Sequence, residues 1–107
     1  MYSEQALLIK IKVEDEFGTP EEVKSLWELS SQLSAATSGV GEFDGEERGH
    51  GFCTFYLYGP SADHLLDMVS PVLRAFPAKP GSIIVRRYGP RGAAERMTSL
   101  PLQGHAD

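Results

Sequence analysis

Four side chains that can bind a divalent metal ion stand close together near the middle of the chain. Carboxylates and imidazole are common ligands of such ions, and this cluster consists of Asp44, Glu46, Glu47 and His50. No pair among them has the spacing of a known metal motif, and acid-rich turns are typically solvated. We therefore expect no metal site here and no cofactor.

The single cysteine, Cys53, is a candidate nucleophile if His50 or His64 acts as its base. Cys53 falls at an inward position of an expected strand, where a cysteine behaves as a small core residue. His64 stands near the start of an expected helix, a position typical of a surface side chain. We expect no catalytic residue.

The octapeptide from Arg48 to Phe55 resembles the ribonucleoprotein motif of RNA-recognition domains, whose aromatic rings stack on bases. The chain departs from that pattern, with His50 at an aromatic position and Cys53 at an aliphatic one. The companion motif needs an aromatic residue on the first strand, where Leu8 stands, and the neighbouring acidic turn repels phosphate. We expect that the chain does not bind nucleic acid.

The elements that position these residues follow from the spacing of apolar side chains. Residues 7–13 alternate with the period of a half-buried strand, with Leu7 and Ile9 on one face and Leu8 and Lys10 on the other. Thr19 with Glu22 forms a capping box that predicts a helix over 20–38. The apolar positions of that helix are Val23, Leu26, Trp27, Leu33 and Thr37.

Further along the chain, a weak strand is expected over 40–44, followed by a glycine-rich turn over 45–49. An aromatic strand over 52–58, a second helix over 61–76 and a last strand over 82–88 complete the pattern. This order predicts an α+β domain of the ferredoxin-like βαββαβ type. We expect a four-stranded antiparallel sheet in the order 4-1-3-2, two helices on one face, one domain over residues 1–103 and a loose tail over 104–107.

The sheet face that the helices leave open is the main predicted binding surface. The residues assigned to it are Phe52, Tyr56, Tyr58, Ile84, Arg86 and Tyr88. Such a large aromatic area is rarely left bare on a monomer. It predicts a homodimer or another protein partner, unless it forms the floor of a ligand cleft or is covered by residues 91–102.

Charge is expected to separate along the sheet. The topology places nine of the fifteen acids at the end opposite the two Tyr-Gly-Pro turns at 58–60 and 88–90. The part of this acidic end contributed by the expected second strand and hairpin is Glu42, Asp44, Glu46 and Glu47. The net charge of −5 argues against general nucleic-acid binding and favours a basic protein partner.

The runs 40–45, 56–63 and 87–90 resemble a group of small uncharacterised bacterial proteins. The resemblance implies a bacterial, stand-alone domain, and it brings no activity with it. The longest apolar run is only four residues and the N-terminus has no basic region, so we expect a cytoplasmic protein without a membrane span. Three functions stay open: a non-catalytic interaction module such as an immunity protein against a basic toxin, a ligand-binding protein or enzyme built on a dimer, and an RNA-binding domain.

Overall fold

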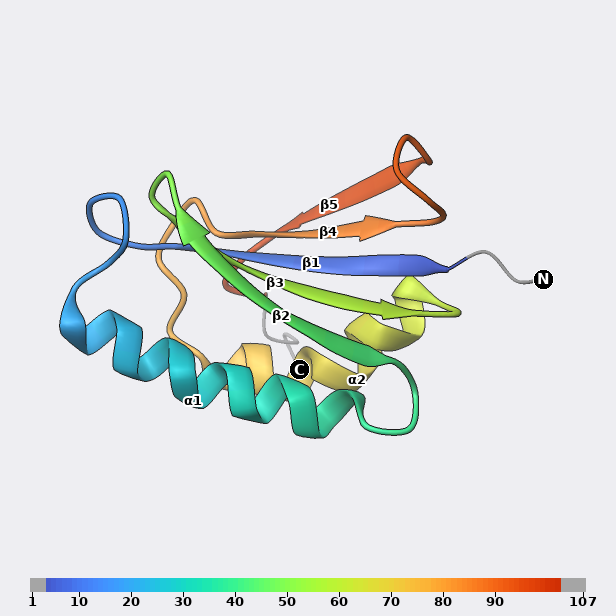
Figure 1. Cartoon of the computed structure of the whole chain (residues 1–107), viewed down its shortest axis with the longest axis horizontal. Helices are drawn as coiled ribbons and strands as arrows, with labels where there is room; N and C mark the ends of the chain where they lie inside the picture. The colour runs from blue at the N-terminus through green and yellow to red at the C-terminus, as the bar shows by residue number, and fades with distance from the viewer. Residues whose placement is uncertain (1–3, 103–107) are drawn as a thin grey trace, which may run out of the picture.

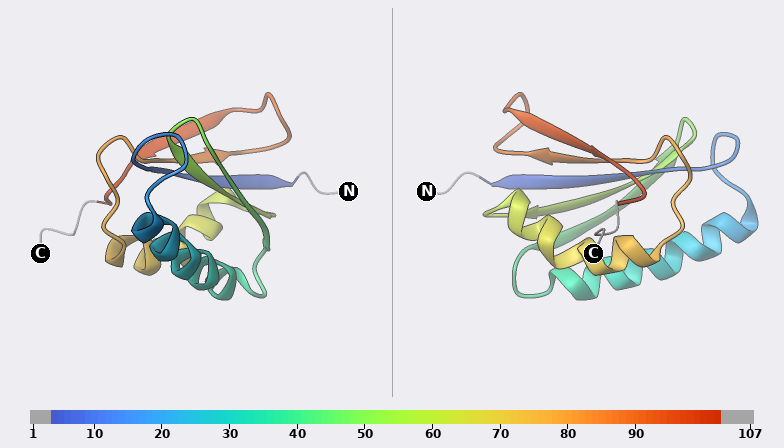
Figure 2. Two further views of the ribbon diagram at one scale, coloured as in Figure 1. Left: turned by 60° about the vertical axis from the view of Figure 1, so that its left-hand side comes forward. Right: turned by 180° about the vertical axis from the view of Figure 1, so that it is seen from behind.

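The computed structural model describes residues 4–102, which form two layers (Figure 1). One layer is an antiparallel sheet and the other is a pair of helices on one of its faces, as seen from two further sides in Figure 2. In chain order the elements are β1 (Gln5–Lys12), α1 (Pro20–Thr37), β2 (Glu42–Gly49), β3 (Phe52–Gly59), α2 (Ala62–Ala75), β4 (Ile83–Arg87) and β5 (Glu95–Ser99). The predicted tail of residues 104–107 lies outside the described residues.

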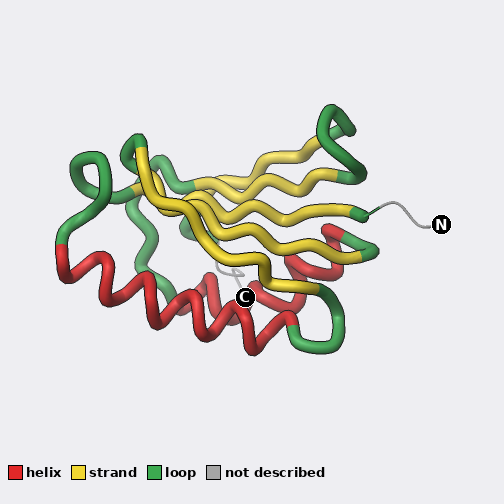
Figure 3. Tube along the Cα trace, viewed as in Figure 1, coloured by secondary structure: helices red, strands yellow, loops and turns green. Residues whose placement is uncertain are grey.

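The sheet has five strands in the order β2-β3-β1-β4-β5, and every neighbouring pair is antiparallel. The prediction of an α+β fold with two helices and an antiparallel sheet is confirmed. The prediction of a four-stranded ferredoxin-like sheet is wrong, because β5 pairs with β4 and becomes an edge of the sheet (Figure 3). The predicted spatial order β4-β1-β3-β2 is still present within the five-stranded sheet, with β1 at its centre.

Both helices begin with the caps that the sequence indicates. The Thr19 hydroxyl accepts a hydrogen bond from the Glu22 amide at 3.1 Å, and the Glu22 carboxylate accepts one from the Thr19 amide at 2.8 Å. Ser61 caps α2 by accepting from the His64 amide at 3.1 Å. These bonds satisfy amide groups that a helix start otherwise leaves unpaired.

The core lies between the helices and the covered face of the sheet. The inward residues of β1 and β3 are almost completely buried, and Phe55 and Leu57 have no exposed surface. They pack against Leu26, Leu29 and Leu33 of α1 and against the apolar side of α2. The period-two pattern of these strands therefore predicted their buried face correctly.

The second strand is longer than predicted, and the turn after it lies elsewhere. β2 runs to Gly49, and a register shift between Phe43 and Glu46 takes up the glycine that had suggested a turn. The hairpin turn is His50-Gly51, and both residues have positive φ values, of 55° and 83°. Positive φ at both positions is what a two-residue hairpin turn requires.

The C-terminal segment extends the sheet instead of folding back over its open face. β5 lies beside β4, and Met97 on it is 64% exposed. After the strand, Leu100 enters the core with only 4% of its surface exposed, and its amide donates to the Ser82 carbonyl at 2.9 Å. Neither helix within residues 4–102 is long and apolar enough to cross a bilayer.

Candidate functional site

The open face of the sheet, which is the face turned away from both helices, carries a row of apolar side chains. Residues directly opposite each other in a ladder share a face. Met97 lies opposite Val85, Val85 opposite Leu8, and Leu8 opposite Tyr56. We call these four residues the apolar row. It crosses β5, β4, β1 and β3 without a charged residue between them.

Two lysines flank the apolar row on the side nearest the hairpin. The Lys10 and Lys12 ammonium groups lie 5.4 Å and 5.1 Å from the centre of the Phe52 ring. Each contact of this kind contributes about 0.5–1 kcal/mol at an exposed site. The Phe52 ring is therefore already in contact with cations of its own chain.

A hollow of about 490 Å³ opens on the same face where the β2–β3 hairpin meets the loop that follows β1. Hydrogen bonds fix this loop against the turn, because the Gly51 carbonyl accepts from the Val13 amide at 2.9 Å and the Gly51 amide donates to the Glu16 carbonyl at 3.0 Å. The lining residues include Leu8, Lys10, Phe17, Phe52 and Tyr56. The open face is thus concave at one end.

Tyr56 links the apolar row to the acidic edge strand. Its hydroxyl donates to the Glu47 carboxylate at 2.9 Å. Partial burial and the neighbouring Glu47 charge both raise the pKa of the Tyr56 phenol, so it stays a neutral donor. The ring can therefore contribute apolar area while its polar end is already satisfied.

The register of the strands corrects the expected placement of Ile84, Arg86 and Tyr88 on the open face. Ile84 opposes Ile9 and Arg86 opposes Leu7, so both point toward the helices. The Tyr88 hydroxyl bonds to a side chain of α2, which places it on that side as well. The phase of the strand is displaced by one residue, which exchanges the two faces. The open face instead receives Ile83, Val85 and Arg87.

The three displaced residues include two that form a polar cluster with α2. The Asp63 carboxylate accepts from the Tyr88 hydroxyl at 2.7 Å and from the Arg86 guanidinium at 3.0 Å. These bonds lower the pKa of Asp63, and its carboxylate raises that of Tyr88. The Nε atom of Arg86 is buried and has no hydrogen-bond partner among residues 4–102. The cluster ties β4 to the start of α2.

The acidic residues predicted to gather at one end of the sheet instead lie along its edge strand β2. Glu42 opposes Tyr58, beside one of the Tyr-Gly-Pro turns and far along the strand from the hairpin. Because β2 is a full strand, Glu42, Asp44, Glu46 and Glu47 are spread along its length. The expectation that they crowd one end of the sheet was wrong, since it rested on a turn at 45–49.

The hairpin divides the octapeptide of residues 48–55, which resembles the ribonucleoprotein motif. His50, which would occupy an aromatic stacking position, lies in the turn with a positive φ value. Of the two positions at which the motif would stack bases, His50 and Phe52, only Phe52 reaches the open face, where it lies opposite Lys12. A turn between Gly49 and Phe52 therefore accounts for the glycines of this motif.

Cys53 is a core residue. It has no exposed surface, and its thiol lies 3.6 Å from a Glu46 carboxylate oxygen. Burial and the Glu46 charge raise the pKa of Cys53 to about 12, so the nucleophilic thiolate is disfavoured at neutral pH. Among the described residues, no three His, Cys, Asp or Glu side chains lie together as metal ligands.

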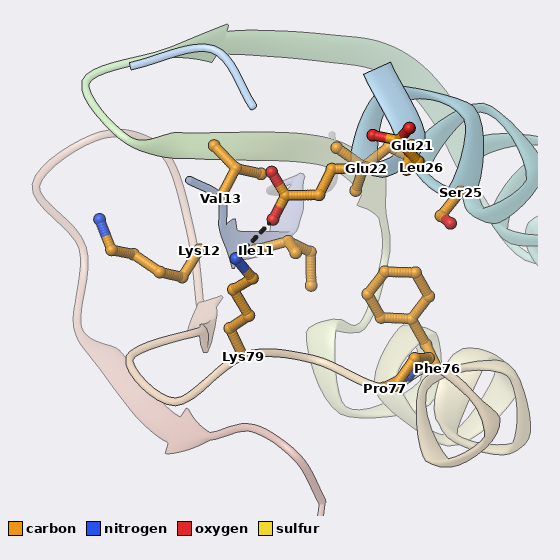
Figure 4. A pocket seen from close by; sticks show the side chains of 10 residues that line it. All are labelled: Ile11, Lys12, Val13, Glu21, Glu22, Ser25, Leu26, Phe76, Pro77 and Lys79. Carbon is orange, nitrogen blue, oxygen red and sulfur yellow. Dashed lines mark ion pairs between the residues drawn. The ribbon is translucent and has the colours of Figure 1, made fainter. Parts of the chain in front are cut away.

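A smaller hollow, which the sequence did not indicate, lies between the sheet and the helices. It measures about 200 Å³ and is enclosed by the start of α1, the end of β1 and the loop after α2 (Figure 4). The Lys79 ammonium lies 2.8 Å from the Glu22 carboxylate across its mouth. Lys79, together with the Thr19 amide, lowers the pKa of Glu22 to about 2. A loop lysine carries no sequence signal of such a contact.

Searches of protein-family models, curated proteins and solved structures found no significant match to this chain.

Proposed function

We propose that this protein is a non-catalytic interaction module that associates through the open face of its sheet, most simply as a two-fold dimer. The observation that carries the proposal is the apolar row, which spans four strands and ends at Met97 with 64% of its surface exposed. Of residues 91–102, which could have covered the face, Glu95–Ser99 extend the sheet as β5 and Leu100 enters the core. Val85 is only 8% exposed, Leu8 and Tyr56 are half-buried and Met97 is largely exposed, so part of the row faces solvent. Apolar area left on an open sheet face is typical of an interface.

Burial of the apolar row is energetically favourable at about 25 cal/mol for each Å² removed from water. The flanking Lys10 and Lys12 do not oppose it, because their aliphatic stems can pack while the ammonium groups reach the rim. Tyr56 adds a ring whose hydroxyl is already paired with Glu47. A self-complementary arrangement of such a patch needs only a two-fold axis.

The most concrete version of this role is neutralisation of a basic toxin by an immunity-type protein. The net charge of −5 and the acidic β2 strand support it, because opposite charges speed association and select partners. A toxin gene beside this gene, and protection of cells by its product, are the expected observations.

A second candidate, binding of a small molecule, is supported by the hollow of about 490 Å³ on the same face. Apolar walls with a few polar groups are typical of ligand sites. In this case the hollow would be filled by a ligand, and self-association would not be needed. RNA binding has weaker support, because His50 lies in the turn.

The decisive experiment compares the mass in solution of the wild type, Tyr56→Asp and Met68→Asp. Met68 is 40% exposed on α2, away from the open face, so Met68→Asp controls for a new surface charge. We expect a dimer for the wild type and Met68→Asp, and a folded monomer for Tyr56→Asp. A monomeric wild type at high micromolar concentration would overturn self-association.

A further inference from the structure

We propose that the outer edge of β2 binds, as an added strand, an extended basic segment of a partner protein whose apolar side chains pack on Phe17 and Trp27. This inference does not rest on the open-face association, because it uses the sheet edge and the helix layer. It names a second surface and the chemistry of what it binds.

The edge offers unpaired backbone groups. Among the described residues, β2 pairs only with β3, so its other side has no strand neighbour. Strands with a free edge are the sites at which extended peptides add to a sheet. The register is regular from Glu46 to Gly49, after the shift that follows Phe43. This regular part is where an added strand would pair.

The space beside that edge has an apolar wall. A hollow of about 570 Å³ lies between β2 and α1. Its lining residues are Phe17, Gly18, Val23, Trp27, Glu46 and Arg48. Trp27 falls at an apolar position of the helical pattern, yet it is 61% exposed, and Phe17 is 57% exposed. Two large aromatic side chains are thus uncovered in one hollow.

The geometry relates the edge to this wall. Side chains alternate across a strand, so every second residue of an added strand would face the helix layer. Glu46 and Arg48 of β2 point to that layer, opposite Phe55 and Cys53, and both line the hollow. The inward side chains of the added strand would therefore enter the hollow beside Trp27. The segment would extend the sheet and the core together.

Charge selects the occupant. β2 contains Glu42, Asp44, Glu46 and Glu47 against a single Arg48. A second copy paired antiparallel along this edge would bring acids against acids, which is destabilising. Lysine or arginine in the added strand would instead be attracted to these acids. The expected occupant is thus a basic segment with apolar residues at alternate positions.

The test uses an eight-residue peptide that alternates lysine and valine, and the fluorescence of Trp27. Trp27 is the only tryptophan of the chain, so its emission reports on this hollow without labelling. We expect a saturable shift of the emission to shorter wavelength, weaker at high salt. A peptide N-methylated at alternate residues keeps the charge but loses backbone donors, and it should bind at least tenfold more weakly.

Two charge-reversed proteins provide matched controls, with binding measured by calorimetry. Asp44→Lys with Glu46→Lys changes the edge, and Glu28→Lys with Glu95→Lys makes the same change of net charge elsewhere. The first should weaken binding at least tenfold and the second by less than threefold. Trp27→Ser should also weaken it, and this variant leaves the strand intact.

Three outcomes would overturn the inference: no saturable shift of the wild type up to about 1 mM peptide, equal affinity for the N-methylated peptide, or equal effects of the two charge-reversed proteins. A dimer that dissociates on Trp27→Ser would show that a second copy occupies the edge, and would also overturn it. None of these results depends on whether Tyr56→Asp dissociates an open-face dimer.

Discussion

The two faces of the sheet carry different kinds of side chain. The covered face is mainly aliphatic at its centre, where the rings of Phe43 and Phe55 pack together, and the inward residues of β1 and β3 are almost completely removed from water. The open face mixes aromatic rings with lysines, and Met97 at its edge is largely exposed. The same alternating strands thus serve two purposes. The residues of the covered face form the core and stabilise the fold. The residues of the open face can contact a partner molecule.

The largest expected effect separates neighbouring residues of β3. Phe55→Ala should lower the free energy of unfolding by about 3–5 kcal/mol, because it leaves a cavity between the sheet and the helices. Tyr56→Ala, one residue along and on the open face, should cost much less in the monomer. Denaturant unfolding of both variants measures the difference. Equal losses would mean that the two faces are buried alike.

The next comparison tests the C-terminal segment. Leu100 is 4% exposed and contacts the core, whereas Met97 lies on the open face. Leu100→Ala should cost about 2–3 kcal/mol, and Met97→Ala should change monomer stability by less than about 0.5 kcal/mol. Thermal unfolding at low protein concentration checks this. A neutral Leu100→Ala would show that the core does not need the segment after β5.

The Glu22 carboxylate, paired with Lys79 and with the Thr19 amide of the capping box, makes stability depend on pH. Because the pKa of Glu22 falls from 4.5 to about 2 on folding, its contribution is complete above pH 4.5 and is lost as the pH falls toward 2. Glu22→Gln should cost about 1 kcal/mol at pH 7 and progressively less below pH 4.5. Glu21→Gln, in the same turn, is the control. Parallel pH profiles of Glu22→Gln and wild type would contradict the assignment.

The smallest effect is expected at the hairpin turn. His50 has a positive φ value of 55°, a conformation that asparagine adopts more readily. His50→Asn should raise the free energy of unfolding by about 0.5 kcal/mol. His50 borders the hollow of the open face but belongs neither to the apolar row nor to the hollow beside Trp27, so the change should leave peptide binding and self-association unaltered. A destabilised variant would indicate that the imidazole makes a contact of its own.

The sequence predicted the parts of the fold in which one period dominates. The alternation in β1 and β3 gave the correct buried face, and Thr19 with Glu22 marked the start of α1. In β4 the run Ile83-Ile84-Val85 is apolar throughout, so no alternation fixes its phase, and the strand was assigned one residue out. For that reason Ile84 was predicted on the open face, although it lies on the covered face.

The two edge strands were predicted poorly for a different reason: β5 was not predicted, and β2 was predicted only as a weak strand over 40–44. An edge strand is only partly buried, so its residues need not be apolar. β5 contains one large apolar residue, Met97, and β2 reads as an acidic turn around Gly45. The pairing with β4 reveals β5, and the pairing with β3 shows that β2 continues to Gly49. The aromatic hollow beside β2 was missed because helical spacing placed Trp27 with the core.

The central position of β1 has a consequence for how the chain is made. Leu8 pairs with Val85, which is added 77 residues later during synthesis. At about 5–20 residues per second, roughly 4–15 s pass before that partner exists. During this interval the central strand of the sheet has one side without its final neighbour. A ribosome stalled within α2 would therefore hold a chain that is prone to aggregate, and a chaperone would have its greatest influence at that stage.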